Sequence, residues 1–244
     1  MRRLILPRAA VHRGPLILVN GEHPLADGAA PELAVVDERF PHIRMERRAA
    51  VLLAACIQAV GGWSEIVPVS GWRSRREQEE IWADALREQG EEFTRSFVAR
   101  PGCSEHETGL AMDLGKAAEE VDFLRPDFPD LGACRAFGRT AARYGFILRY
   151  RGEKRPLTGI AAEPWHFRYV GVPHAQLMEE HGLCLEEYVP FLRRAERRVR
   201  LEGGRTARVS HVPCRGSRTE LTLPDECCQV SGDNEDGFIV TAWE

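Results

Sequence analysis

The chain has 244 residues, of which 43% are hydrophobic and 29% are charged, and its formal net charge at pH 7 is −4. This composition predicts a globular protein with a substantial core, built as one large domain or as a main domain with a small appendage. The nearly balanced charge excludes the broad basic field that attracts nucleic acid. No apolar run approaches the roughly 18 residues of a membrane span, so we expect neither a nucleic-acid partner nor a membrane span.

The first segment, residues 1–43, is rich in Pro and Gly and contains only brief apolar runs, such as residues 16–19. It predicts one short strand within otherwise irregular chain. After Arg2 and Arg3 come only three apolar residues before Pro7, which is too short for the apolar region of a secretory signal. We therefore expect a cytoplasmic protein whose seven cysteines are reduced.

From residue 45 onward the pattern becomes that of a helix. Leu53, Cys56, Ile57 and Val60 recur at helical spacing, and the glycines at 61–62 supply a stop. This spacing predicts an amphipathic helix with one buried face. Cys56 is therefore expected in the hydrophobic core.

A short β-prone run at residues 66–70 leads into a second predicted helix. Ser74 and Glu77 have the spacing of a capping box, in which each side chain satisfies a free backbone N–H of the first helical turn. Arg73 consequently lies at a strand-to-helix junction, where rigid flanking elements hold a side chain that the turn exposes. We consider Arg73 a candidate functional residue, and a plain surface arginine is the open alternative.

The next elements follow the same reasoning. Helical spacing predicts a helix at residues 131–144 with Cys134 in the core, and residues 146–148 predict a strand. Further helices are expected at residues 173–182 and at residues 185–198, the latter bent near its internal proline.

The composition changes after residue 198. Short alternating runs broken by Gly and Pro predict a small β-rich C-terminal appendage at residues 199–244, whose role the sequence does not indicate. We expect residues 1–198 to form the catalytic domain. The adjacent Cys227 and Cys228 in the appendage have no assigned role.

Two separated clusters supply the ligands of a catalytic zinc. His106 and Asp113 lie on either side of Gly109, where the chain can turn into a predicted strand, and His166 follows some fifty residues later. Two imidazoles and one carboxylate leave the fourth position of zinc open for water. A His-x6-Asp spacing alone is weak, but the second cluster strengthens it, and we predict one zinc ion per chain.

Glu163, three residues before His166, is then left over as the catalytic base. Zinc with these ligands lowers the pKa of its water to about 7, and an adjacent carboxylate can take the water proton and pass it to the leaving amine. Arg73, if it reaches the site, would stabilise the oxyanion by a charge-assisted hydrogen bond. Ser104 would either donate to a substrate carboxylate or cap the turn.

Three neighbours of His106 are not expected to take part. Glu105 and Glu107 are interpreted as solvated carboxylates of the turn, with recognition of a substrate ammonium as the alternative. Cys103 and His106 have a Cys-x2-His spacing, but no second pair stands nearby to complete a structural zinc site.

Three blocks in this order resemble the zinc D,D-peptidases of the VanY, VanX and VanXY type. They are SGWRS at residues 70–74, PGCSEHETG at residues 101–109 and EPWHFRYVG at residues 163–171. The likeness covers roughly residues 15–190. The resemblance implies an α+β fold in which a small antiparallel sheet, flanked by helices, carries the zinc site, and an activity that cleaves the D-Ala-D-Ala bond.

The resemblance also assigns roles to individual residues. His106, Asp113 and His166 match the zinc ligands, and Glu163 and Arg73 match the catalytic base and the oxyanion-stabilising arginine. Ser104 matches the serine that precedes the first histidine in the family, which implies that Ser104 binds substrate. The appendage departs from the compact family core.

The resemblance leaves the substrate open. A VanX-like or VanXY-like enzyme acts on the free dipeptide or on cytoplasmic precursors that end in D-Ala-D-Ala. This activity would lower the pool of D-Ala-D-Ala, so that a glycopeptide antibiotic loses its target. One alternative is a peptidoglycan stem-peptide endopeptidase with the same site. Another is a non-catalytic zinc-binding domain of the hedgehog type, against which the presence of both Glu163 and Arg73 argues.

Overall fold

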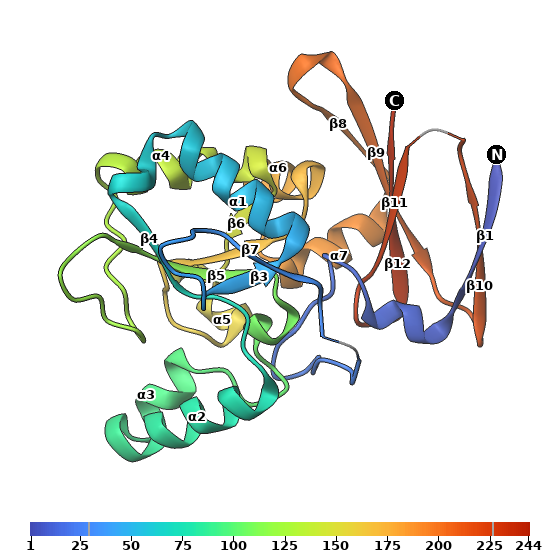
Figure 1. Ribbon diagram of the computed structural model, residues 1–244. Coiled ribbons are helices and arrows are strands. Elements are labelled where there is room, and N and C mark those ends of the chain that lie inside the picture. Colours follow the sequence, from blue (N-terminus) through green and yellow to red (C-terminus); the bar gives the residue numbers. More distant parts are fainter. Residues whose placement is uncertain (29, 226) are drawn as a thin grey trace. The chain divides into compact units, whose positions relative to one another are not determined.

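The computed structural model describes residues 1–28, 30–225 and 227–244, which form two compact units (Figure 1). The larger unit is the continuous stretch Val19–Glu179. The smaller unit joins Met1–Leu18 to Glu180–Glu244.

This division differs from the boundary expected after residue 198. The first strand, β1 (Arg2–Pro7), pairs antiparallel with β10 (Arg218–Leu223), so the N-terminal residues belong with the C-terminal strands. No local pattern in residues 1–18 predicts pairing with a strand more than 200 residues away. The pairing therefore places the first residues in the β-rich unit, and residues 180–198 belong to the same unit.

The larger unit is built on a four-stranded antiparallel sheet with the strand order β4-β5-β7-β6. Its strands are β4 (Ile66–Ser70), β5 (Ala111–Lys116), β7 (His166–Tyr169) and β6 (Phe146–Leu148). A separate two-stranded sheet consists of β2 (Leu33–Val35) and β3 (Arg44–Glu46). These strands confirm the expected α+β class with a small antiparallel sheet.

Helices flank this sheet, and α1 and α4 lie over one of its faces (Figure 1). The α-helices are α1 (Arg47–Ala59), α2 (Arg75–Gln89), α3 (Glu91–Phe97), α4 (Gly132–Thr140), α5 (Arg155–Thr158) and α6 (Val172–His181). Single turns of 3-10 helix are η2 (Gly62–Ser64), η3 (Glu105–Thr108), η4 (Ala141–Tyr144) and η5 (Gly152–Lys154).

The two faces of the sheet have different chemistry. Met112, Leu114, Phe167 and Tyr169 are buried in one hydrophobic cluster with the inner side chains of α1. Because successive side chains of a strand point to opposite faces, the residues between them face the other way. The strand pattern alone thus directs Asp113 away from the core.

Several local predictions are confirmed. Cys56 on α1 and Cys134 on α4 are buried in the hydrophobic core. The capping box of α2 is present, with the Ser74 Oγ accepting from the Glu77 N–H and the Glu77 carboxylate accepting from the Ser74 N–H at 2.6 Å. It fixes the first turn of α2 directly after Arg73.

Other local predictions are wrong for identifiable reasons. Residues 1–43 contain two short strands, β1 and β2, where one was expected. Residues 16–19 are buried but irregular, with the Leu16 N–H donating to the Ser231 hydroxyl and the Leu18 N–H to the Asp233 carbonyl. The helix expected at residues 185–198 ends at Arg194. The basic run beyond it forms an edge strand, and α3 was not predicted.

The smaller unit carries a second antiparallel sheet, with the strand order β11-β12-β9-β8. Its further elements are α7 (Leu185–Arg194), β8 (Arg197–Arg200), β9 (Thr206–Pro213), β11 (Cys228–Gly232), β12 (Gly237–Trp243) and the 3-10 turns η1 (Arg8–His12) and η6 (Glu202–Gly204). Leu221, Leu223 and Val240 are its buried contacts between β10 and β12. The predicted β-rich character of this region is confirmed.

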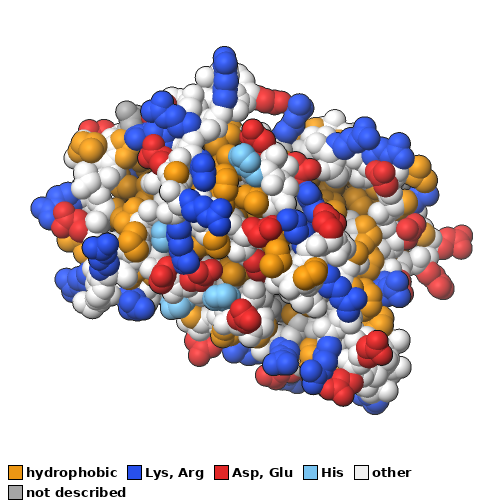
Figure 2. All heavy atoms as spheres, turned by 180° about the vertical axis from the view of Figure 1, so that it is seen from behind, with side chains coloured by type: hydrophobic (Ala, Val, Ile, Leu, Met, Phe, Trp, Pro, Cys, Tyr) orange, Lys and Arg blue, Asp and Glu red, His pale blue; other side chains and the backbone are white. Residues whose placement is uncertain are grey.

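The surface agrees with the composition. On the face shown in Figure 2, basic and acidic side chains are interspersed, as a net charge of −4 predicts. None of the helices in the described part of the chain has both the length and the apolar character to cross a lipid bilayer.

Candidate metal centre and its pocket

Strand pairing brings the distant site residues together. Asp113 on β5 is the direct cross-strand partner of His166 on β7, and on its other side it pairs with Ser70 of β4. Directly opposite residues of an antiparallel pair have Cβ atoms about 4.5–5.5 Å apart. The sheet therefore places the carboxylate beside the second imidazole although 53 positions separate them.

His106 reaches the same place from the turn η3, which precedes β5. Gly109 ends this turn with φ +73°, a left-handed conformation that favours glycine. A Cβ at Gly109 would lie 3.0 Å from the Pro31 side chain and 3.2 Å from the Glu46 nitrogen. The glycine expected to turn the chain into the strand is thus required both by its φ angle and by close packing.

The three predicted ligands converge. Nε2 of His106 lies 3.1 Å from Oδ2 of Asp113, and Nδ1 of His166 lies 2.9 Å from Oδ1 of Asp113. One ligand atom from each residue lies within 4.8 Å of the others, and all three residues are buried. Two imidazole nitrogens and a carboxylate oxygen at this separation are the donor set of a catalytic zinc site.

The tautomer of His106 suits metal binding. Its Nδ1 lies 2.8 Å from the carbonyl oxygen of Gly71, which can only accept a hydrogen bond. Nδ1 therefore carries the proton, and Nε2 presents its lone pair toward Asp113 and His166. Burial, followed by the Arg73 charge, lowers the pKa of His106 to about 4, so the imidazole is neutral at pH 7.

Glu163 lies beside these groups, three residues before β7 begins. Its Oε2 is 3.7 Å from Nδ1 of His166, and its backbone N–H donates to the Tyr150 carbonyl at 3.0 Å. Burial raises the pKa of Glu163 to about 8. A nearby divalent cation favours the ionised carboxylate, which would bring this group into the working range of a general base.

Arg73 lines the same pocket, so it is not a plain surface arginine. Its terminal nitrogens donate to Gln78 Oε1 at 3.2 Å and to Ser70 Oγ at 2.9 Å, and one lies 3.7 Å from Asp113 Oδ2. The side chain is 13% exposed. Within the described residues its buried Nε has no hydrogen-bond partner, so the guanidinium retains a donor.

Gln78 was not recognised from the sequence. It is 1% exposed on α2, accepts from Arg73 and donates to the Ala99 carbonyl at 2.8 Å. Its position in the second turn of a helix that follows Arg73 was the available signal.

Ser104 also lies at this pocket and is 3% exposed. The polar groups line one part of the pocket together with Tyr150 and Trp165. Apolar side chains form the remainder of its lining: Ile81, Phe97, Val98, Ala99, Phe123, Leu124 and Ile160.

The interpretation of Glu105 and Glu107 as solvated carboxylates is wrong. Both are buried, Glu105 between Arg149 and Arg168, and Glu107 where it accepts from the Gly102 N–H at 2.7 Å and from Arg75 Nε at 3.1 Å. Each carboxylate is engaged within the protein. Their partners come from other elements, which the sequence around His106 does not reveal.

This fold and site define a metallopeptidase of one known family. The model of the VanY family, D-alanyl-D-alanine carboxypeptidase, matches residues 42–172, and the chain belongs to this family. The matched region contains all three metal-ligand candidates together with Glu163 and Arg73.

Individual relatives make the comparison more specific. The chain is 41% identical over 179 residues to VanXYC of Enterococcus gallinarum, a bifunctional D-Ala-D-Ala dipeptidase and D-Ala-D-Ala carboxypeptidase, covering 72% of this chain and 94% of that protein. It superposes with a TM-score of 0.98 and 42% identity on the vancomycin resistance D,D-dipeptidase VanXYg in complex with a D-Ala-D-Ala phosphinate analog.

The VanXYg match covers 100% of this chain and 99% of that one, so it includes the smaller unit. The vancomycin resistance D,D-pentapeptidase VanY of a VanB-type cassette, solved with Zn(II), matches with a TM-score of 0.62 and 31% identity over 72% of this chain and 98% of that one. The VanXYg structure therefore matches the smaller unit as well, whereas the match to this VanY covers only part of the chain.

Proposed function

We propose that the chain is a zinc-dependent D,D-peptidase that hydrolyses the D-Ala-D-Ala bond of the free dipeptide, of peptidoglycan precursors, or of both. The observation that carries this proposal is the convergence of His106, Asp113, His166, Glu163 and Arg73 on one pocket. The activities named for VanXYC and the D-Ala-D-Ala analog bound to VanXYg support it.

The metal would be held by Nε2 of His106, the Asp113 carboxylate and Nδ1 of His166, at one zinc ion per chain. The Zn(II) complex of the related VanY supports this identity, as does the donor set itself. When bound, zinc supplies the Lewis acidity that lowers the pKa of water and polarises a carbonyl group.

Glu163 is the proposed general base. Its carboxylate lies next to the metal ligands and is buried, so it can take the proton of the attacking water without competition from bulk solvent. The same group then gives the proton to the departing amine of the terminal D-alanine. Glutamine at this position could hold the water but could not accept its proton.

Arg73 and Ser104 act on the substrate. The guanidinium, fixed by Gln78 and Ser70, would stabilise negative charge that develops on the scissile carbonyl oxygen. The Ser104 hydroxyl would donate to the substrate carboxylate. The apolar part of the pocket lining suits the methyl groups of alanine.

The test is D-alanine release from D-Ala-D-Ala and from a pentapeptide ending in D-Ala-D-Ala. Zinc-loaded wild type, Glu163→Gln and the surface control Glu153→Gln are compared, with zinc content measured on each. We expect Glu163→Gln to lose roughly 10²–10⁴-fold in kcat with zinc retained, and the control to keep wild-type activity.

The outcomes separate the alternatives. The ratio of the two wild-type rates distinguishes a dipeptidase from a carboxypeptidase. If the wild type releases no D-alanine from either substrate but cleaves isolated stem peptides elsewhere, the endopeptidase alternative replaces the D,D-peptidase. Full zinc binding with no hydrolysis of any of these peptides would instead indicate the hedgehog-type binding domain.

A cytoplasmic location and a contribution to glycopeptide resistance are part of the proposal. Such an enzyme would deplete precursors ending in D-Ala-D-Ala before they reach the wall. Cell fractionation tests the location, and the fraction of precursors that end in D-Ala-D-Ala, measured with and without the protein, tests the contribution.

A further inference from the structure

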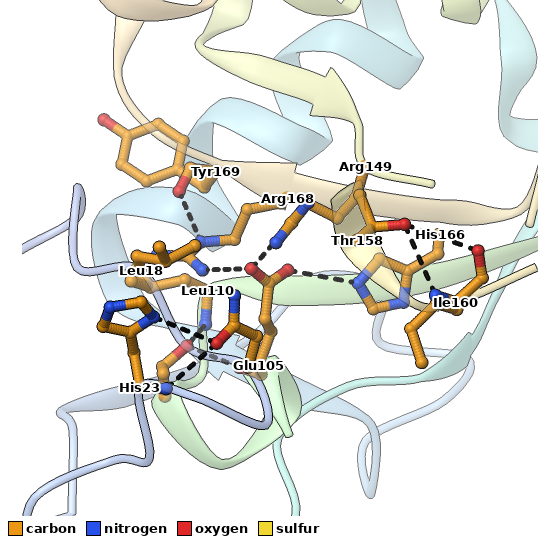
Figure 3. Close-up of polar contacts among 12 residues, drawn as sticks. Leu18, His23, Glu105, Leu110, Arg149, Thr158, Ile160, His166, Arg168 and Tyr169 are labelled. Atoms are coloured by element: carbon orange, nitrogen blue, oxygen red, sulfur yellow. Dashed lines mark hydrogen bonds and ion pairs between the residues drawn. The ribbon is translucent and has the colours of Figure 1, made fainter. Parts of the chain in front are cut away.

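A buried carboxylate lies behind the second metal-ligand histidine. Glu105 sits between Arg149, Arg168 and His166, as Figure 3 shows. The side chains of Glu105 and of both arginines are 0% exposed. The proposed catalytic roles use none of these three residues.

The two arginines hold this carboxylate from one side. Oε1 of Glu105 accepts from Nε of Arg149 at 2.8 Å and from a terminal nitrogen of Arg168 at 2.7 Å. The Nε of Arg168 also donates to the Tyr169 carbonyl at 3.1 Å, which anchors that guanidinium to β7.

The other carboxylate oxygen faces His166. Oε2 of Glu105 lies 3.5 Å from Nε2 of His166, while Nδ1 of the same ring lies 2.9 Å from Asp113. The imidazole thus has a carboxylate at each nitrogen, one in the metal centre and one outside it. Metal-ligating histidines characteristically donate their second N–H to such an outer carboxylate, which fixes the ring and its tautomer.

We propose that Glu105 is a positioning residue that acts through His166. It accepts the Nε2–H of His166, so that Nδ1 presents its lone pair to the metal. Arg149 and Arg168 hold Glu105 in place for this purpose. This inference rests on the zinc centre of the proposed function.

Stability alone does not account for the cluster. A buried arginine–glutamate–arginine group gains little over well-packed apolar side chains, because desolvation of the charges offsets their attraction. Glu107 offers a comparison on the same turn, since it is also a buried carboxylate but binds the Gly102 N–H and Arg75. Glu107→Gln is therefore the matched control for Glu105→Gln.

The test measures zinc affinity by competition with a chromogenic chelator on zinc-stripped protein. Wild type, Glu105→Asp, Glu105→Gln and Glu107→Gln are compared, with near-ultraviolet circular dichroism to confirm the fold. We expect both Glu105 variants to bind zinc about 10–100-fold more weakly, the usual effect of losing an outer partner of a metal ligand, and Glu107→Gln to stay within about threefold. A folded Glu105→Asp with wild-type zinc affinity would overturn the proposal.

Glu105→Gln removes a buried charge that Arg149 and Arg168 both bind, so this variant can fail to fold. A measurement on wild type avoids this problem. In zinc-loaded protein labelled with ¹⁵N-histidine, we expect His166 to show an Nε2–H resonance that is shifted downfield and protected from solvent exchange. An Nε2–H that exchanges freely, or its absence, would overturn the proposal.

These results are independent of the peptidase assay. A wild-type protein that binds no zinc contradicts the proposed function itself. Wild-type zinc binding combined with unchanged Glu105→Asp affinity and an unprotected Nε2–H removes only the role of Glu105.

Discussion

Within the described residues, two clusters combine histidine and carboxylate atoms closely enough to hold a metal ion. One is His106, Asp113 and His166 of the larger unit, and the other is His211, Asp233 and Asp236 of the smaller unit. In each cluster the ligand atoms lie within 4.8 Å of one another. The two clusters differ in what already binds their polar atoms.

In the smaller unit a cation and backbone groups occupy the carboxylates. Arg193 lies 2.6 Å from Asp236 Oδ1 and 3.7 Å from Asp233 Oδ2. Asp233 Oδ1 accepts the N–H groups of Glu235 and Gly237, and Oδ2 lies 2.9 Å from His211. This cluster closes the turn between β11 and β12, and a metal ion would have to displace an arginine.

In the larger unit Arg73 stays 3.7 Å from Asp113 Oδ2, and the ring nitrogens that face away from the metal centre have their own partners. The Gly71 carbonyl holds the far nitrogen of His106, and Glu105 faces the far nitrogen of His166. The nitrogens left over point at Asp113, on the wall of the pocket. A metal site is therefore identified less well by the closeness of histidines and carboxylates than by the partners that their other polar atoms already have.

The largest expected difference between the two clusters is in zinc binding. His106→Ala removes a direct ligand, and we expect zinc affinity to fall more than about 100-fold, beyond the effect of losing an outer partner. His211→Ala should leave zinc affinity and D-alanine release unchanged. Chelator competition on both variants checks this, and a loss of bound zinc in His211→Ala would contradict the contrast.

Arg73 in the larger unit and Arg193 in the smaller unit provide the next comparison. Arg73→Lys shortens and re-shapes the donor at the scissile carbonyl, and we expect kcat to fall roughly 10²–10³-fold with KM little changed. Arg193→Lys should retain kcat. Steady-state kinetics on D-Ala-D-Ala distinguish them, and equal kcat values for Arg73→Lys and wild type would remove Arg73 from the mechanism.

The turn of the smaller unit should contribute to stability instead. Replacing Asp233 by Asn weakens hydrogen bonds from His211, Gly237 and Glu235, which we expect to lower the free energy of unfolding by about 1–3 kcal/mol at pH 7. Urea unfolding of variant and wild type measures this difference. Zinc affinity should not change.

The same turn predicts how the stability of the fold changes with pH. Burial raises the pKa of Asp233, but hydrogen bonds from His211 and the backbone outweigh it, so the folded-state pKa lies below the ordinary value of about 3.9. The carboxylate therefore stabilises the fold at pH values above about 4 and loses this contribution as pH falls through the folded-state pKa. The wild-type advantage over Asp233→Asn should accordingly shrink in urea titrations below about pH 4, and a constant difference would contradict the assignment.

The smallest effect is expected at the start of α2. Ser74→Ala removes the capping box, which should cost about 1 kcal/mol of unfolding free energy, while zinc affinity is retained. Thermal unfolding of Ser74→Ala and wild type measures this loss of stability, and Ser64→Ala in η2 is the control. An unchanged midpoint would show that Glu77 and solvent replace the cap.

The sequence was informative where short motifs carry the chemistry. The strand at β5, the turn at Gly109 and the capping box at Ser74 are local features, and each was found where its pattern placed it. The convergence of His106 and Asp113 with His166 depended on two motifs together. Their geometry then followed from antiparallel pairing.

The sequence was uninformative where the deciding partner lies far along the chain. Glu105 is buried because Arg149 and Arg168 reach it from positions 44 and 63 residues later. The strand at β1 depends in the same way on β10, and nothing near residues 2–7 specifies that partner. Burial of charge and long-range pairing are properties of the assembled core, so local periodicity does not report them.

The pairing of β1 with β10 also sets an order of events during synthesis. The larger unit is one uninterrupted stretch, so it can fold as soon as residue 179 has left the ribosome. The first strand must wait for residues 218–223, while its unpaired edge stays open to other partners. Strand β1 is therefore among the last elements to be paired.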